Sequence, residues 1–262
     1  MKVSIITVSY NSEKTIRDTI KSVLSQKYTN IEYLIVDGGS TDGTVNILKE
    51  YEPFFKGRLK WVSEPDKGLY YAINKGINNV TGELVNILNS DDFYIDSEVI
   101  ELVVKTIKSQ NVDSIYSDLY IVDPINTNKI IRNCTYKNFK KGDFFKGWHP
   151  PHPSFFVKKK IYDNLGNFDT TFKIAADYDF MLRAFEVNNI SSVYLSTHTI
   201  KMRNGGLSTY SLKNRLSSQK ECLYSFEKYN LKLNKIRYFS SKYVNKLKQY
   251  SFKSLIKDLN KK

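Results

Sequence analysis

The sequence predicts an α/β fold in which helices cover both faces of a mostly parallel central sheet, followed by a C-terminal helical extension. Strand-like and helix-like segments alternate from the N-terminus to about residue 110. The strand-like segments are apolar runs rich in Val, Ile and Leu, and a polar cluster follows each of them. Such alternation is typical of parallel sheets, and apolar runs are typical of strands buried on both faces.

The elements are expected in the following order. Strands are predicted over 3–8, 31–36, 59–62 and 84–88, and the helices between and after them over 12–26, 42–51, 68–79 and 96–109. Beyond residue 109 the pattern changes to a strand pair over 112–122 and 129–132, an aromatic-rich loop over 144–153, a strand over 154–157 and a helix over 158–165. A helix over 177–188 and strands over 192–195 and 199–203 complete the body.

Residues 1–210 contain no linker and no internal repeat, so we expect one domain there and a separate helical tail over 211–262. The net charge of +13 is concentrated in the tail. Residues 213–262 hold fourteen Lys and Arg against three acidic residues, a net +11, which leaves +2 for residues 1–212. The basic character therefore belongs to the tail rather than to the body.

The end of the tail has the spacing of an amphipathic helix, with apolar residues three and four apart. These residues are Phe252, Leu255, Ile256 and Leu259. Such a basic helix favours attachment to an anionic membrane surface. The alternative is a solvated helix that packs its apolar stripe on the body.

Several classes of protein do not fit the composition. The only cysteines, Cys134 and Cys222, lie far apart, so a disulfide framework or a paired-cysteine zinc site is not expected. No apolar run approaches the ~18–20 residues that span a bilayer. No signal-like segment precedes the first strand. We expect a cytoplasmic protein.

Two adjacent carboxylates, Asp91 and Asp92, follow the buried strand over 84–88. In an open parallel sheet, ligands bind outside the carboxyl ends of the strands. A hard cation such as Mg²⁺ or Mn²⁺ prefers one or two carboxylates together with substrate phosphates. We therefore predict a metal site here. The alternative is a turn or a cap for the helix that follows.

Polar clusters also follow the other strands, over 9–11, 37–40 and 64–67. Asp37 can accept a hydrogen bond from a base, Tyr10 offers a ring for stacking, and Thr7 or Val8 offers its backbone. Lys67 is a candidate cation for a diphosphate. The alternatives are that Asp37 caps the next helix and that Tyr10 is a core aromatic.

Taken together, four segments resemble family 2 glycosyltransferases, which are nucleotide-sugar-dependent inverting enzymes with the GT-A fold, a Rossmann-like αβα sandwich. The segments are VSIITVSYN (3–11), DGGSTDGT (37–44), SEPDKG (63–68) and NSDD (89–92). The resemblance extends, in the family's order, to HPSFF (152–156), GNFD (166–169), AADYD (175–179) and GGLS (205–208). It covers about residues 1–210.

The resemblance implies a nucleotide-sugar half over about 1–110 and an acceptor half over about 111–210. It implies that Asp37 contacts uracil N3, and that a mobile loop over 205–208 closes over the donor. Asp92 and Asp91 are the implied metal ligands. The expected donor-binding residues are Thr7, Val8, Tyr10, Asp37, Asp66, Lys67, Asn89, Asp91, His152 and Arg203.

Inverting transfer needs a base that takes the proton of the acceptor hydroxyl as its oxygen attacks C1. Asp177 begins a predicted helix, where a carboxylate could equally be a cap; the resemblance implies that Asp177 is the catalytic base. Asp179 faces another side of that helix and is expected to pair with Arg183.

The histidines are less clearly placed. His149 and His152 lie in the aromatic-rich loop, where either could contact the diphosphate or the metal. Alternatively, this loop packs Trp148 against the acceptor sugar. His152 matches the family position better, and no role is assigned to His198. One departure concerns the donor: relatives have an acidic residue where this chain has Tyr71, which leaves the sugar identity open.

The resemblance, which is closest to bacterial enzymes that build O-antigen or capsule repeats, implies a metal-dependent inverting hexosyltransferase that uses UDP-Glc, UDP-Gal or UDP-GlcNAc. The expected acceptor is a glycan hydroxyl on an undecaprenyl-diphosphate carrier, in O-antigen or capsule synthesis at the inner face of the cell membrane. A sugar-phosphate nucleotidyltransferase is a weaker alternative, because SYNS (9–12) is not a Gly-rich basic loop. A nucleic-acid-binding protein is weaker still, because the basic residues lie mostly on the tail.

Overall fold

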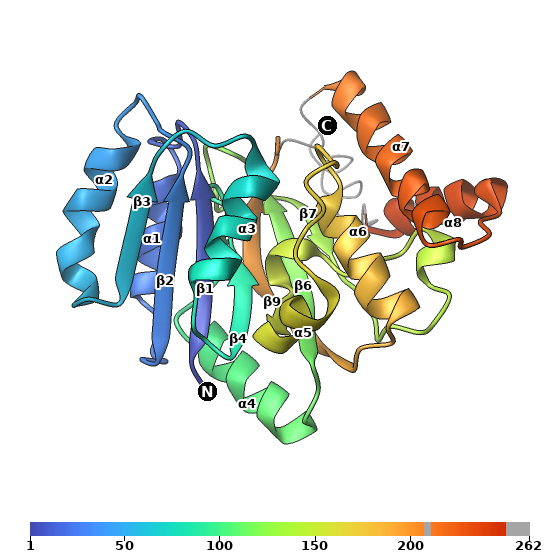
Figure 1. Ribbon diagram of the computed structural model, residues 1–262, viewed down its shortest axis with the longest axis horizontal. Coiled ribbons are helices and arrows are strands. Elements are labelled where there is room, and N and C mark those ends of the chain that lie inside the picture. The colour runs from blue at the N-terminus through green and yellow to red at the C-terminus, as the bar shows by residue number, and fades with distance from the viewer. Residues whose placement is uncertain (207–210, 250–262) are drawn as a thin grey trace, which may run out of the picture.

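The computed structural model describes residues 1–206 and 211–249 (Figure 1). In this part of the chain, nine strands form one sheet in the order β3-β2-β1-β4-β8-β6-β9-β5, with β7 paired to β6 outside this path. Helices cover both faces of the sheet, with α3 in front of it and α1 behind it in Figure 1. The predicted α/β fold is confirmed.

The N-terminal half contains β1 (Val3–Ser9), α1 (Ile16–Leu24), β2 (Ile31–Asp37), α2 (Thr44–Tyr51), the 3₁₀ turn η1 (Glu52–Phe55), β3 (Leu59–Ser63), α3 (Leu69–Asn79), β4 (Leu84–Ile87), β5 (Phe93–Tyr94) and α4 (Val99–Gln110). The C-terminal half contains β6 (Ser114–Val122), β7 (Ile130–Cys134), the 3₁₀ turns η2 (Phe144–Lys146) and η3 (His152–Ser154), β8 (Phe156–Lys158), α5 (Lys159–Leu165), α6 (Ala176–Leu182), the π-helical turn η4 (Arg183–Val187), β9 (Ser192–Arg203), α7 (Leu212–Lys228) and α8 (Lys235–Gln249).

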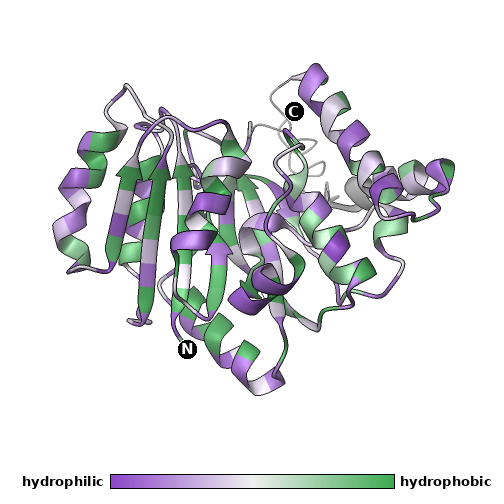
Figure 2. Cartoon of the chain, viewed as in Figure 1, coloured by the Kyte–Doolittle hydropathy of each residue, from purple (hydrophilic) through white to green (hydrophobic). Residues whose placement is uncertain are grey.

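β1 lies at the centre of the parallel part of the sheet, between β2 and β4. Every residue of β1 is buried, because successive side chains of a strand point to opposite faces and helices cover both. Ile6 and Val8 belong to the buried cluster under α3, whereas Val3 and Ile5 belong to the cluster under α1. Figure 2 shows the apolar residues that dominate these strands.

The second half of the sheet is mixed. β8 is antiparallel to both β4 and β6, and β9 is parallel to β6. The two strands predicted over 192–195 and 199–203 are one strand, β9. Its register shifts beside Ser117 and Asp118, where Leu195 and His198 are the successive partners. Residues 196–197 are therefore accommodated as an irregularity within one strand rather than as a turn.

The tail packs on the body. Cys222 and Phe226 of α7 and Tyr238 of α8 are at most 5% exposed and belong to the same buried cluster as Tyr178 of α6. The Phe226 ring lies 6.4 Å from that of Tyr178 and 5.9 Å from that of Tyr238. The described part of the tail therefore shares a hydrophobic core with residues of α6.

The predicted pairing of Asp179 with Arg183 is wrong. Asp179 is fully buried and lies 3.2 Å from Lys228 Nζ, at the end of α7, and 3.0 Å from the hydroxyl of Tyr229, the residue that follows α7. Arg183 instead donates to the Gly166 and Asn167 carbonyls. The docking of α7 against α6 supplied a nearer cation, which the sequence spacing of α6 alone does not reveal.

Two expectations fall partly or wholly outside the described residues. The predicted apolar stripe Phe252, Leu255, Ile256 and Leu259 lies outside them, and so do the last two residues of the predicted mobile loop over 205–208. Within residues 1–206 and 211–249, none of the helices has the length and apolarity that crossing a bilayer requires.

Candidate active site

The carboxyl ends of β1, β2 and β3 bring Asp37 between two serines. Ser9 is the partner of Asp37 on one neighbouring strand and Ser63 on the other. Both hydroxyls donate to the Asp37 carboxylate, at 2.8 and 2.7 Å, and Ser40 adds its backbone N–H at 2.8 Å and its hydroxyl at 2.5 Å. Burial disfavours the charge of Asp37, but these hydrogen bonds outweigh it and lower the pKa of Asp37.

These four hydrogen bonds fill the acceptor positions of the Asp37 carboxylate. A base N–H could be accepted there only if one serine hydroxyl turned away. The contact with uracil stays a prediction. The geometry also gives Asp37 a second role, because it ties together the ends of three strands.

The residues predicted around the base differ in exposure. Tyr10 is 66% exposed, so it is not a core aromatic, and its ring lies against Gly38. Val8 is 7% exposed and Thr7 is fully buried. The Thr7 hydroxyl donates to the Leu88 carbonyl at 2.8 Å, which fastens β1 to the segment that follows β4. Tyr10 is therefore the member of this group that is open to a ligand.

Asp92 has the most unusual environment of the predicted site residues. It is 1% exposed; its Oδ2 accepts a hydrogen bond from Asn89 Nδ2 at 2.9 Å, whereas its Oδ1 is buried without any partner. Burial, and then the neighbouring charge of Asp91, raise the pKa of Asp92 well above its usual value. Burial also raises the pKa of Asp91. β5 follows directly, so this pair does not cap α4.

Arg203, the last residue of β9, is hydrogen-bonded to the backbone of the Asp91–Asp92 turn. Its Nη1 donates to the Asp91 carbonyl at 2.6 Å, its Nε donates to the Pro124 carbonyl at 3.3 Å, and its Nη2 forms an ion pair with Asp18. The side chain is 5% exposed. All three of its nitrogens are used within the protein, so direct contact with a donor would require one of these bonds to break.

Asp66 and Lys67 lie in the loop between β3 and α3. Asp66 Oδ2 is buried without a partner. Burial raises the pKa of Asp66, although Lys75 opposes the shift, while Glu64 and Asp37 add to it. Lys67 is exposed. This loop approaches the Asp37 edge, since a Cβ on Gly39 would lie 3.1 Å from the Pro65 nitrogen.

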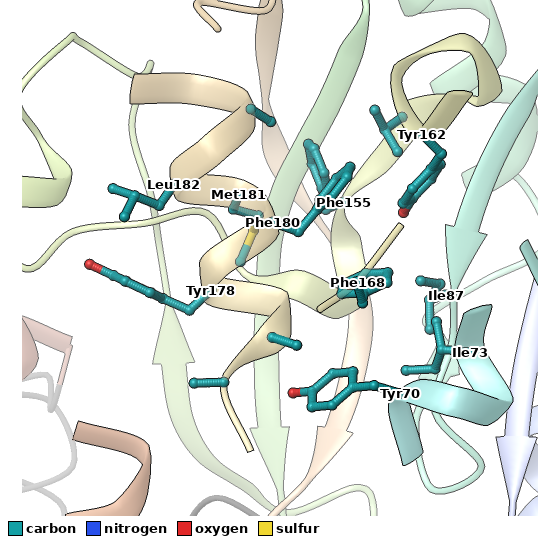
Figure 3. Close-up of a cluster of buried hydrophobic side chains, with 14 of the residues drawn as sticks. Tyr70, Ile73, Ile87, Phe155, Tyr162, Phe168, Tyr178, Phe180, Met181 and Leu182 are labelled. Atoms are coloured by element: carbon teal, nitrogen blue, oxygen red, sulfur yellow. The ribbon is translucent and has the colours of Figure 1, made fainter. Parts of the chain in front are cut away.

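The same loop leads into α3, whose first turn meets the predicted base. The Tyr70 hydroxyl lies 3.3 Å from Asp177 Oδ1 and 2.7 Å from the Ile174 carbonyl. Figure 3 shows this hydroxyl pointing toward the start of α6. Burial, and then the charge of Asp177, raise the pKa of Tyr70 well above its usual value, so it remains a neutral donor. Tyr70 was not predicted as a site residue, because only the packing of α3 on α6 reveals it.

Two histidines lie near Asp177. Burial lowers the pKa of His152, whose ring packs edge-on against Phe168 at 5.8 Å, and Asp177 opposes the shift. Burial and then the charge of Lys242, from α8, lower the pKa of His149. Both rings are therefore neutral near pH 7. Lys242 was not predicted here, since its place depends on the docking of α8.

Within the described residues, the contacts of His198 are with the sheet rather than with Asp177 or the two other histidines. Its ring stacks on Tyr120 at 3.8 Å, and its Nε2 lies 2.6 Å from Asn133 Oδ1. These contacts join β9 to β6 and β7.

The arrangement can be compared with known proteins. The family model described as Glycosyl transferase family 2 matches residues 4–172. The chain belongs to this family of glycosyltransferases. Rv1514c, an uncharacterized glycosyltransferase of Mycobacterium tuberculosis (strain ATCC 25618 / H37Rv), is 34% identical over 185 residues, which cover 70% of this chain and 68% of the relative.

Solved structures show the same fold. S. aureus TarS 1–349, in complex with UDP-GlcNAc, has a TM-score of 0.63 and 21% identity, and covers 78% of this chain and 59% of its own. The mannosyltransferase PcManGT from Pyrobaculum calidifontis, in complex with GDP-Man and Mn²⁺, has a TM-score of 0.57 and 19% identity over 74% of this chain and 55% of its own. The predicted GT-A fold and the predicted glycosyltransferase are confirmed, and the two alternative functions fall away.

Proposed function

We propose that this family 2 glycosyltransferase moves a hexose from a UDP-sugar, with inversion, to a hydroxyl of a glycan on a lipid diphosphate. Mn²⁺ or Mg²⁺ would assist the transfer. The observation that carries the proposal is the buried, unpartnered Oδ1 of Asp92 at the edge of the sheet where the polar strand ends gather.

A divalent cation fits the residues at this edge. A buried carboxylate oxygen without a partner, with a raised pKa and a second carboxylate beside it, is the environment that a cation would stabilise. Among the residues that the structure describes, no three His, Cys, Asp or Glu side chains form a metal cluster. The remaining ligands would therefore be phosphate oxygens of the donor. Held by Asp92 and Asp91, the ion would offset the negative charge of the departing diphosphate.

The protein's own part in the reaction is proton removal and orientation. In this proposal, Asp177 accepts the proton of the acceptor hydroxyl, whose oxygen forms a bond to C1 of the sugar on the face opposite the diphosphate. The bond from C1 to the diphosphate breaks, and its electron pair leaves with UDP. The Tyr70 hydroxyl shares its one proton between the Ile174 carbonyl at 2.7 Å and Asp177 Oδ1 at 3.3 Å, which restricts the direction of the carboxylate. Tyr10 stacks on the base.

The described tail supports attachment to an anionic membrane. Apolar side chains on its two helices are at least half exposed: Leu212 at 76%, Leu216 at 61%, Ile236 at 84% and Val244 at 50%. They alternate with the Lys and Arg residues that make the tail basic. Exposed apolar side chains interspersed with cations are suited to an anionic lipid surface. Attachment there would bring the enzyme to a lipid-linked acceptor of a surface polysaccharide such as O-antigen or capsule.

The donor and the metal can be tested in one experiment. The melting temperature is measured with UDP-, GDP- and TDP-sugars, each with and without Mn²⁺, because a ligand that binds the native state raises it. We expect a rise with UDP-sugars that requires the metal and is lost in Asp92→Ala. A larger rise with a GDP-sugar, or a rise that is independent of metal, contradicts the donor or the metal assignment respectively.

The base is tested by UDP release in Asp177→Asn, with Asp163→Asn as the matched control. Asp163 is an exposed carboxylate of α5 that pairs with Lys159. We expect Asp177→Asn to lose about two to four orders of magnitude of activity, with donor binding retained. Asp163→Asn should retain wild-type activity. Near-normal activity in Asp177→Asn would remove the proposed base.

Membrane attachment is tested by flotation with vesicles of phosphatidylglycerol or phosphatidylcholine. We expect the protein to float with the anionic vesicles, and the double variant Leu212→Glu/Leu216→Glu to float less. Equal flotation with both vesicle types would contradict the electrostatic part of the proposal.

A further inference from the structure

A basic groove lies between the aromatic loop and the start of α8. It consists of two neighbouring cavities, of about 290 and 350 Å³, which share Lys146 in their lining. Lys137 and Trp148 line one of them, and Lys232 and Arg237 line the other. None of these residues belongs to the donor edge or contacts Asp177.

The lining of this basic groove carries a net positive charge. Its single acidic lining residue, Asp143, is 1% exposed and lies 2.8 Å from Lys137 Nζ and 3.9 Å from Lys146 Nζ. Four cations and one carboxylate leave the lining at +3. Within the described part of the chain, no carboxylate lies within ion-pair distance of Lys232 or Arg237. A hollow lined by one sign of charge concentrates ions of the opposite sign.

The groove exists because α8 docks on the aromatic loop. Gly147 has a φ of +67°, and a Cβ there would lie 2.6 Å from Lys242 Cβ and 3.1 Å from the Tyr238 carbonyl. With this contact in place, Lys232 and Arg237 of the tail line the same cavity as Lys146 of the loop. The loop continues from Gly147 to His149, whose ring packs edge-on against Tyr178, the residue after Asp177, at 5.2 Å.

We propose that the basic groove binds the diphosphate of the acceptor. Lys and the forked guanidinium of Arg are the side chains suited to phosphoryl oxygens. Four cations spread over two adjoining cavities suit an elongated anion with two phosphoryl groups better than a single phosphate. The choice of the acceptor as its source rests on the proposed lipid-diphosphate acceptor. The tail then forms part of acceptor recognition as well as membrane attachment.

Binding is tested with inorganic pyrophosphate as the probe. The chain has two tryptophans, so Trp61→Phe leaves Trp148, in the groove, as the sole fluorescent reporter. We expect saturable quenching by pyrophosphate, with phosphate binding at least about tenfold more weakly. The double variant Lys146→Gln/Arg237→Gln should weaken pyrophosphate binding on the order of a hundredfold. Lys105→Gln, an exposed lysine of α4, is the matched control and should bind normally.

The source of the phosphoryl groups is decided by two further measurements on the same variants. With a lipid-diphosphate acceptor, Lys146→Gln/Arg237→Gln should raise the acceptor KM at least about tenfold while the UDP-sugar KM stays unchanged. With phosphatidylglycerol vesicles, the double variant should lose less flotation than Leu212→Glu/Leu216→Glu, because it removes one cation of the tail and none of its exposed apolar side chains. Loss of flotation with a normal acceptor KM would assign the groove to lipid headgroups and overturn the proposal. Absence of pyrophosphate quenching would also overturn it.

Failure of the proposed function would look different. If the wild type transfers nothing to a lipid-diphosphate acceptor but still binds pyrophosphate at Trp148, the groove is an anion site and the assignment to the acceptor is overturned. A melting temperature within about 2 °C of the wild type shows that the variants are folded; a 1 kcal/mol loss would shift it by about that amount or more in a chain of this size.

Discussion

Gly147 is the position where a single methyl group would test the docking of α8 most directly. Its φ of +67° lies in the left-handed region, and an added Cβ would lie 2.6 Å from Lys242 Cβ and 3.2 Å from Lys242 Cα. Both atoms are close to the backbone of α8, so the clash cannot be relieved by rotation of a flexible side chain. Gly147→Ala therefore forces α8 or the loop to move.

The matched control is Gly142→Ala, in the same connection between β7 and β8. Gly142 has a φ of +90°, and an added Cβ there would have nothing within 4 Å. Either alanine lowers the free energy of unfolding by about 1–2 kcal/mol, because a residue with a Cβ is strained in the left-handed region. Only Gly147→Ala adds overpacking, which costs about 1–3 kcal/mol. We expect the free energy of unfolding to fall by about 1–2 kcal/mol in Gly142→Ala and by about 2–5 kcal/mol in Gly147→Ala.

Urea unfolding at 25 °C, followed by circular dichroism, measures both variants on the same scale. The informative quantity is the difference between them, in which the backbone penalty largely cancels. Equal losses would show that α8 is not packed against Gly147 in solution. That result would remove the contact that forms the basic groove.

Three further predictions concern the ion pairs and hydrogen bonds near the site. Burial works against the charge of Asp169, but the hydrogen bonds that Asp169 accepts from Lys228 and Thr171 lower its pKa to about 2. The charged Asp169 therefore adds fully to the free energy of unfolding above the pKa of an unfolded Asp, near 4, and this contribution disappears as the pH falls toward 2. Asp169→Asn should therefore cost about 2 kcal/mol at pH 6 and little at pH 2 in acid-titrated urea unfolding; a pH-independent difference would contradict this. Tyr70→Phe should lower kcat roughly fivefold without changing the donor KM, as expected for about 1 kcal/mol of hydrogen bonding to Asp177; an unchanged kcat argues against a positioning role. Arg203→Lys should lower the free energy of unfolding by about 2 kcal/mol and weaken donor binding, because an ammonium cannot replace three separate guanidinium contacts; unchanged donor binding would separate it from the site.

The parts of the fold that the sequence predicted correctly are those controlled by short-range pattern. The apolar runs of β1, β2 and β4 identified buried strands because a strand covered on both faces has no polar alternation. The carboxyl ends of parallel strands meet at one edge, so the polar cluster at Asp37 was correctly expected to meet those of its neighbours. β5, with only two residues, is too short to leave such a pattern.

The sequence proposed a set of candidate site residues, but it could not show the bonds that these residues make. The pattern of strand ends singled out Asp92, yet nothing in it shows that Oδ1 is buried without a partner. It singled out Asp37 as an acceptor, yet not that serines fill its acceptor positions. Arg203 was expected to contact the donor, but its three nitrogens contact Pro124, Asp91 and Asp18 within the protein.

By itself, the sequence determined the family, the order of the elements and which strand ends carry polar side chains, because each of these depends on residues close together along the chain. Only the tertiary structure decided which side chains touch. Tyr70 meets Asp177 across more than a hundred residues, Lys228 displaces Arg183 as the partner of Asp179, and the tail completes a groove on the body. The physical reason is that such contacts follow from how helices pack on the sheet, and local periodicity determines which face of a helix is buried without determining which neighbour covers it.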